Sequence, residues 1–273
     1  MKIKSGLEVA GATDPGCVRV NNEDNFAIEE DLGLLLVADG MGGHNSGEVA
    51  SDIATQTVRD FARKMIGGPR QLVPEGGDPK ASARARQLEH FIKIANTMIY
   101  EKGRAFPRDA GMGTTVVAVL ADCRSLTLAH VGDSRAYLFR RGHLQQLTED
   151  HSLVTEQVRR GLISAAEAAK SNLQNILTRA LGAEKDVAVD VCEQPLMPGD
   201  VVLLASDGLT KMVDDDAVAR TIAAAPSARC IVDSLIAQAR QAGGVDNVTV
   251  IAARVPGARR DPFRNFVARI LGR

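Results

Sequence analysis

Short apolar runs recur along the chain and predict buried β-strands. They are rich in valine, leucine and isoleucine, and glycine or aspartate bounds them, which is typical of strand ends. The predicted strands are residues 34–38, 115–120, 125–131, 135–139, 201–205 and 248–252. The gaps in the middle of the chain are too short for a crossover helix, so we expect antiparallel hairpins there.

Longer blocks carry apolar residues three or four positions apart, which predicts amphipathic helices. The first block runs from Val49 to Met65, with Asn45 as its N-cap and Glu48 as the partner of that cap. The second runs from Leu88 to Ile99, and a third begins near Ala228. Residues 164–167 (SAAE) form a capping box that should open a short helix.

The order of these elements indicates the fold class. Strands come first, then two helices, more strands, a small helical insert, further strands, a helix and a last strand. This order favours an α+β fold with antiparallel sheet and helices packed on its faces. We expect one domain over residues 1–255, followed by a tail over residues 256–273.

Composition excludes several classes of protein. Apolar residues make up 45% of the chain, enough for a sizeable core, and 33 basic against 34 acidic residues leave a net charge of −1. That balance does not support a nucleic-acid binder. Neither a transmembrane stretch nor the apolar core of a signal peptide is found, so we expect a cytoplasmic protein. The four cysteines form no zinc spacing.

Aspartates recur at the ends of the predicted strands. Asp39, Asp133 and Asp207 each stand within two residues of a strand end, and Asp246 stands just before the last strand. An ionised carboxylate at the edge of a buried strand is costly unless something pairs with it. Four carboxylates at strand ends could converge at one rim of the sheets, and too few basic residues lie beside them to neutralise such a cluster.

Divalent cations would neutralise such a cluster. Carboxylate oxygens without cysteine or histidine favour Mg²⁺ or Mn²⁺ over zinc or copper. The alternative is that each aspartate is an ordinary turn residue, because Asp-Gly is a common turn pair. The residues and their spacing therefore predict a carboxylate metal site and do not identify its reaction.

The sequence around these aspartates resembles the motifs of a known family, the bacterial type 2C (PPM) metal-dependent serine/threonine protein phosphatases. The matching segments are residues 19–24 (RVNNED), 37–44 (VADGMGGH), 113–115 (GTT), 131–137 (VGDSRAY), 147–152 (LTEDHS), 176–182 (ILTRALG), 204–209 (LASDGL) and 246–249 (DNVT). They follow the family's order, and the match runs from about residue 7 to residue 255.

The resemblance implies a fold and a reaction. The fold is a four-layer αββα sandwich, in which two antiparallel β-sheets are flanked by helices. The reaction is hydrolysis of phosphoserine and phosphothreonine in proteins, by direct attack of a water or hydroxide that bridges two Mn²⁺ or Mg²⁺ ions.

The resemblance also assigns roles to residues of the cluster. Asp39 should bridge both ions, the Gly40 carbonyl should bind one of them, and Asp207 and Asp246 should complete the shell of the first. Asp133 and Asp207 match ligands of a third, weakly bound ion.

Further roles carry over to the opening motif. Glu23 and Asp24 match the acidic pair that holds metal-bound waters. Arg19 matches the arginine that binds the substrate phosphate, since a guanidinium offers paired donors to phosphate oxygens. The alternative for Arg19 is a solvated surface residue.

The chain departs from the family's pattern at the proton donor and in one segment. Met41 stands where eukaryotic members have histidine, as it does in bacterial members, and cannot donate a proton. His44 and Asn247 are candidates to assist, and the alternative for His44 is a loop residue that packs near the site. Residues 152–182 match the family's mobile flap, but Ser171 and Asn172 replace its usual His-Pro, which leaves substrate preference open.

Other readings fit the sequence less well. Residues 132–136 (GDSRA) miss the serine-hydrolase elbow by their last residue and precede a strand, and no phosphate-binding P-loop is present. A non-catalytic phosphopeptide-binding module and a partner-switching regulator are the alternatives from other classes. The tail has an apolar stripe and arginines, so it could pack on its own domain, dock a partner or touch an anionic membrane.

We expect the partners to be phosphorylated proteins, among them a bacterial serine/threonine kinase and its targets. The chain itself should be a monomer.

Overall fold

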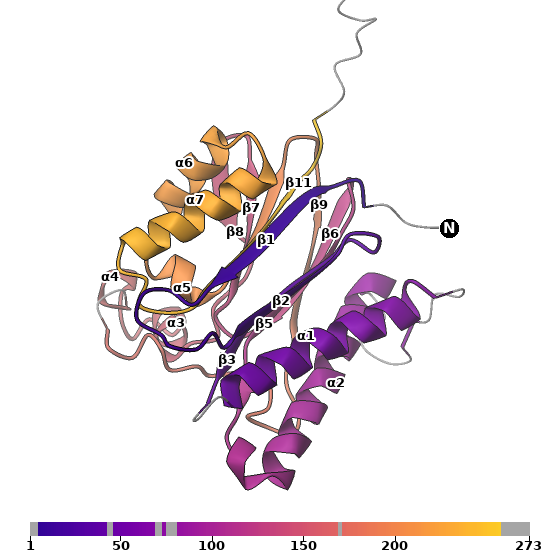
Figure 1. The fold of residues 1–273 in the computed structure, drawn as a ribbon, viewed down its shortest axis with the longest axis vertical. Coiled ribbons are helices and arrows are strands. Elements are labelled where there is room, and N and C mark those ends of the chain that lie inside the picture. The colour runs from indigo at the N-terminus through magenta and orange to yellow at the C-terminus, as the bar shows by residue number, and fades with distance from the viewer. Residues whose placement is uncertain (1–4, 43–45, 69–72, 75–80, 169–170, 258–273) are drawn as a thin grey trace, which may run out of the picture.

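Two antiparallel β-sheets pack face to face, and helices cover their outer faces (Figure 1). The computed structural model describes residues 5–42, 46–68, 73–74, 81–168 and 171–257. The first sheet has the strand order β1-β11-β10-β7-β8. Its strands are β1 (Glu8–Asp14), β7 (Arg135–Arg140), β8 (His143–Gln146), β10 (Val201–Ala205) and β11 (Val248–Arg254).

The second sheet has the order β2-β3-β5-β6-β9, and a short strand, β4, pairs with β3 beyond this path. Its strands are β2 (Asp24–Glu29), β3 (Leu34–Met41), β4 (Gly113–Thr114), β5 (Val116–Ala121), β6 (Ser125–Val131) and β9 (Asp190–Pro195).

Helices lie on the outer face of each sheet (Figure 1). The long pair α1 (Ser46–Met65) and α2 (Ala83–Ala105) covers the second sheet, and α6 (Asp215–Ala224) and α7 (Ala228–Gln241) cover the first. The shorter helices are η1 (Pro107–Asp109), α3 (Leu153–Arg159), α4 (Ala165–Ala168) and α5 (Asp207–Thr210).

Strand β3 shows why the central strands read as unbroken apolar runs. Successive side chains of a strand point to opposite faces. Leu34 and Leu36 pack outward against α1 and α2, whereas Leu35 and Val37 pack inward with residues of the first sheet. Both faces of the strand are buried, so no polar alternation interrupts the run.

The architecture predicted from the sequence is confirmed. The sheets are antiparallel, helices flank them, and every predicted strand is present, two of them with the expected limits. The capping box is also present, because the Glu167 carboxylate accepts from the Ser164 N–H at 2.7 Å. The expected N-cap Asn45 and nearly all of the C-terminal tail, residues 258–273, lie outside the described residues.

Among the described helices, none combines the length and the apolar character that crossing a bilayer would require.

Candidate metal centre

One cavity of about 230 Å³ gathers most of the predicted site residues. It opens where β3, β6, β10 and β11 reach the same end of the two sheets. Its lining consists of Arg19, Glu23, Asp39, Gly40, Met41, Gly42, Thr115, Asp133, Asn175, Leu177, Asp207, Lys211, Asp246 and Asn247. The structure thus brings the four strand-end aspartates together. His44 lies outside the described residues.

Asp39 occupies the most strongly anionic position in this cavity. Its backbone is fixed on both sides by Thr115, whose Oγ1 accepts from the Asp39 N–H at 3.1 Å and whose N–H donates to the Asp39 carbonyl at 2.9 Å. Burial raises the pKa of Asp39 well above its usual range, and the charges of Asp24, Asp207 and Asp133 raise it further. Asp39 therefore needs a cation to stay ionised at neutral pH.

Asp24 lies behind the cavity lining, directly across from Asp39 in the β2–β3 register. One carboxylate oxygen accepts from the hydroxyls of Ser206 and Thr249, each at 2.7 Å, and the other is buried without a hydrogen-bond partner. Burial raises the pKa of Asp24 to about 7, and the two hydroxyl donors partly oppose that rise.

Asp133 sits in the tight turn between β6 and β7. Gly132 before it has φ of +108°, and a side chain there would collide with Thr115, so only glycine fits. Ser134 after it shares a hydrogen bond of 2.7 Å with Thr115. Burial, together with the charge of Asp207, raises the pKa of Asp133 to about 7.

Asp207 begins α5 immediately after β10 and Ser206. One of its oxygens is ion-paired with the Lys211 ammonium, four residues on, and the other is buried without a hydrogen-bond partner. The Asp207 side chain is 15% exposed and that of Lys211 26%, so the pair is shielded from water on most sides. Burial alone would lower the pKa of Lys211, but the hydrogen bond and charge of Asp207 and the charge of Asp133 outweigh it and raise that pKa.

Asp246 lies at the mouth of the cavity and forms an ion pair with Arg19, the arginine of the opening motif. Arg19 Nε lies 2.9 Å from one Asp246 oxygen, and Arg19 Nη2 donates to the other at 3.0 Å. Hydrogen bonding and attraction to Asp246 raise the pKa of Arg19. The Arg19 side chain remains 52% exposed, so its guanidinium lies at the border between the carboxylates and solvent.

The remaining expected residues hold the cavity wall together. Glu23 lines the cavity, and burial raises the pKa of its carboxyl group. The Glu23 carbonyl accepts from the Gly40 N–H at 3.1 Å. A side chain at Gly40 would lie 2.1 Å from the Gly47 carbonyl oxygen, so glycine lets β3 approach the first turn of α1.

Asn247 acts as a brace between loops. Its Oδ1 accepts from the Glu23 N–H at 2.8 Å, and its Nδ2 donates to the carbonyls of Pro15 and Asn21. With both ends of its amide engaged in this way, Asn247 holds Glu23 in place and is poorly suited to assist the reaction directly.

The cluster fits divalent cations on its own geometry. Several carboxylates face one small cavity, burial raises the pKa of Asp24, Asp39 and Asp133, and buried oxygens of Asp24 and Asp207 have no partner. Buried polar atoms are normally paired, and an all-oxygen ligand set suits Mg²⁺ or Mn²⁺.

Sequence reasoning missed several residues that shape this centre. Lys211 was detectable, because its spacing of four residues from Asp207 is that of a helical ion pair. Ser206 and Thr249 stand inside recognised motifs, but their contact with Asp24 joins residues more than 180 positions apart. No local pattern could have shown that contact.

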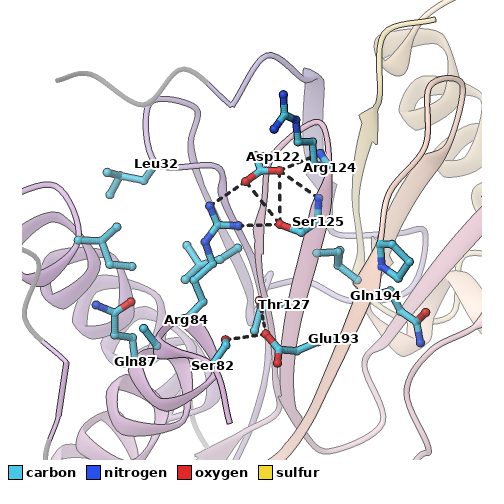
Figure 2. Close-up of a pocket in the computed structure, with 15 residues that line it drawn as sticks. Leu32, Ser82, Arg84, Gln87, Asp122, Arg124, Ser125, Thr127, Glu193 and Gln194 are labelled. Carbon is cyan, nitrogen blue, oxygen red and sulfur yellow. Dashed lines mark hydrogen bonds and ion pairs between the residues drawn. The ribbon is translucent and has the colours of Figure 1, made fainter. Parts of the chain in front are cut away.

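A larger cavity of about 680 Å³ lies at the other end of β5, beside Asp122 (Figure 2). Its two carboxylates are already engaged within the protein. Asp122 is ion-paired with Arg84 at 2.8 Å, and Glu193 accepts from Ser82 at 2.6 Å and from Thr127 at 3.1 Å. This cavity therefore shows no cluster of uncompensated charge comparable to the one around Asp39.

Known proteins resemble the chain over most of its length. The family described as Protein phosphatase 2C matches residues 19–241. A serine/threonine phosphatase, Stp, of Listeria welshimeri is 37% identical over 246 residues, which cover 88% of this chain and 92% of the relative.

Solved structures agree with that relationship. The serine/threonine phosphatase PstP/Ppp of Mycobacterium tuberculosis superimposes with a TM-score of 0.81 at 34% identity, covering 92% of this chain and 99% of that one. The catalytic domain of PstP in complex with two manganese ions gives a TM-score of 0.77 at 34% identity, with 91% and 97% covered.

Proposed function

The chain belongs to the protein phosphatase 2C family and is a serine/threonine protein phosphatase, and from that premise we propose which residues carry the reaction. The observation that supports the proposal most directly is the set of buried carboxylates around Asp39 with a guanidinium at its mouth. In this proposal residues 1–255 are the catalytic domain, and the tail from residue 256 is separate from it.

Two divalent ions, Mn²⁺ or Mg²⁺, would be held by the strand-end residues. Asp39 would contact both ions, and the Gly40 carbonyl would contact one of them. Asp207, through its unpartnered oxygen, and Asp246 would complete the shell of the first ion. Support for a pair of ions comes from the manganese complex of PstP.

Other residues would act on the shell and on the substrate. When bound, the ions supply an acidified water as nucleophile and neutralise charge on the phosphate. Glu23 and Asp24 would orient ion-bound waters, and the Ser206 and Thr249 hydroxyls fix the Asp24 carboxylate for this task. Arg19 would bind the phosphate from the solvent side with its paired N–H groups.

The third ion implied by the family resemblance fits this chain less well. Its expected ligands are Asp133 and Asp207, and the Lys211 ammonium already neutralises one Asp207 oxygen. The proposed mechanism therefore uses two ions and assigns no step to a third. Asp133 would instead add its negative charge to the cavity wall beside Asp39 and Asp207, and so help to hold the two ions. Met41 lines the cavity and has no proton to give, so the leaving alcohol takes its proton from another group.

The biological role proposed for the chain is to oppose a bacterial serine/threonine kinase by dephosphorylating its targets, as a monomer. Purified protein with Mn²⁺ should release phosphate from phosphoserine and phosphothreonine peptides and much less from a matched phosphotyrosine peptide. Tight binding of these peptides without phosphate release would instead indicate a phosphopeptide-binding module.

Arg19→Ala should separate phosphate binding from metal binding. Removing a charged donor pair costs roughly 2 kcal/mol of substrate binding, which corresponds to a KM about thirtyfold higher. Affinity for Mn²⁺ should stay the same or rise, because Arg19 no longer shares the Asp246 oxygens. Steady-state kinetics and calorimetry with Mn²⁺ measure the two effects, and a large loss of Mn²⁺ affinity would contradict the role given to Arg19.

A further inference from the structure

His151 contacts the Asp133 turn from outside the metal centre. Its ring Nδ1 lies 3.0 Å from the Gly132 N, and its backbone N–H donates to the Gly132 carbonyl at 3.0 Å. Gly132 is therefore held by both the side chain and the main chain of His151. Asp133 is the next residue, so its position depends directly on this double contact.

These hydrogen bonds fix the protonation state of the ring. The Gly132 N–H can only donate, so Nδ1 must accept and Nε2 must carry the proton. Nε2 then donates to the Asp190 carboxylate at 3.3 Å. Burial, together with the charges of the nearby His130 and Arg179, lowers the pKa of His151 to about 4, which keeps this neutral form at physiological pH.

A second layer of contacts orients the ring. Arg179 Nη1 is 2.6 Å from the Asp190 oxygen that does not face His151. His130 stacks on the His151 ring with centroids 4.7 Å apart, and its own Nε2 donates to the Glu149 carbonyl at 3.0 Å. The His151 ring is therefore held at its face and at both nitrogens, which fixes its orientation toward Gly132.

His130, His151 and Asp190 also have the spacing of a metal site, since their potential ligand atoms lie within 4.8 Å of one another. The hydrogen bonds argue against that use. A neutral His151 that accepts at Nδ1 has no lone pair left at Nε2, and Arg179 already compensates Asp190. His130, His151 and Asp190 therefore form a hydrogen-bonded support for the turn at Gly132.

His151 also contacts the segment that lines the cavity with Asn175 and Leu177. Ser152 forms an isolated bridge with Leu177, and the Thr178 N–H donates to the His151 carbonyl at 2.8 Å. The two ends of the segment 152–177 therefore both lie beside His151.

We propose that His151 is a positioning residue for Asp133, held in place by Asp190 and Arg179. It acts through the Gly132 amide and does not touch the substrate. The inference rests on the proposed function, because the position of Asp133 affects turnover only if the carboxylate cluster is the reaction site.

A double-mutant cycle tests this role. In His151→Asn the side-chain oxygen can take the place of Nδ1, whereas His151→Gln extends past Gly132 toward Asp190. With p-nitrophenyl phosphate and Mn²⁺, His151→Gln should lower kcat about tenfold at unchanged KM, as loss of an outer-shell partner does. His151→Asn should keep most of the activity. In an Asp133→Ala background, His151→Gln should lower kcat by less than about twofold.

Amide exchange provides a readout that does not depend on turnover. NMR should show faster hydrogen exchange at the Gly132 amide in His151→Gln, with protection restored in His151→Asn. His143→Gln, on the exposed edge strand β8, is the matched control and should change neither measurement. Equal losses of kcat with and without Asp133, or unchanged exchange at Gly132, would overturn the proposal. A wild-type protein that releases no phosphate would instead refute the proposed function, while the exchange test still stands.

Discussion

Phosphate release from a phosphothreonine peptide should stop when divalent ions are chelated and return when Mn²⁺ or Mg²⁺ is added back. The cavity proposed as the reaction site holds Asp39, Asp133, Asp207 and Asp246, with only Arg19 and Lys211 as fixed cations among its lining residues. Without added cations this cluster repels a phosphate dianion. Divalent ions contribute several kcal/mol of charge stabilisation, so the loss should be about a thousandfold or more.

The measurement is phosphate release before chelation, in excess EDTA, and after re-addition of each ion. An unchanged circular dichroism spectrum in EDTA at the assay temperature would show that the fold persists and that the loss concerns the centre alone. Ca²⁺ is the informative control, since it is a hard cation of larger radius with a looser geometry. Full activity after thorough chelation would be incompatible with the two-ion proposal.

The pattern of the sequence predicted the interior of the fold better than its edges. The strands found from sequence, such as β5 and β10, are buried on both faces and read as unbroken apolar runs. The strands that the pattern missed include β1, β2, β8 and β9, which are the edge strands of the two sheets. The two faces of β9 differ in exposure, so its residues alternate between half-buried and exposed and give no unbroken apolar run.

The candidate site was predictable to the level of its carboxylates. Aspartates at the ends of buried strands must be neutralised, and the two antiparallel sheets bring those strand ends to one cavity. The neighbours of the carboxylates were not predictable. Asp24 accepts from the hydroxyls of Ser206 and Thr249, and the Gly132 amide beside Asp133 donates to His151, contacts between residues that are not neighbours in the sequence.

Arg19 shows a limit of motif reasoning. The family motif assigns Arg19 to the phosphate and Asp246 to a metal ion, as separate roles. In the structure the two side chains form a paired contact. The roles are compatible if the two oxygens of Asp246 are shared between the ion and the guanidinium, which is the arrangement that the Arg19→Ala measurements examine.

The second large effect should follow from Asp39→Asn, which changes one atom at the most central ligand. An amide oxygen is a much weaker ligand for a hard cation than a carboxylate, and Asp39 is the residue proposed to contact both ions. We expect Mn²⁺ binding at both proposed ion positions to fall below detection by calorimetry and kcat to fall roughly a thousandfold. Asp31→Asn, at an exposed turn outside the cavity, should behave as wild type.

The stability of the metal-free Asp39→Asn protein should change in the opposite direction from its activity. A rise in stability would exclude misfolding as the cause of the lost activity. Burial and neighbouring carboxylates raise the pKa of Asp39 in the folded protein. Above the unfolded pKa of about 4, the unfolded chain releases a proton that the folded chain retains, so Asp39 destabilises the metal-free fold increasingly as pH rises. Asn at this position carries no charge and removes that cost.

In EDTA, Asp39→Asn should therefore melt above wild type, by a few degrees at pH 8 and by less at pH 5. In Mn²⁺ the order should reverse, because only wild type gains from the bound ions. Thermal unfolding at the two pH values, with EDTA or Mn²⁺, measures all four combinations. If Asp39→Asn melted below wild type in EDTA at pH 8, Asp39 would be a structural hydrogen-bonding residue. Its charge would then no longer be evidence for a metal centre.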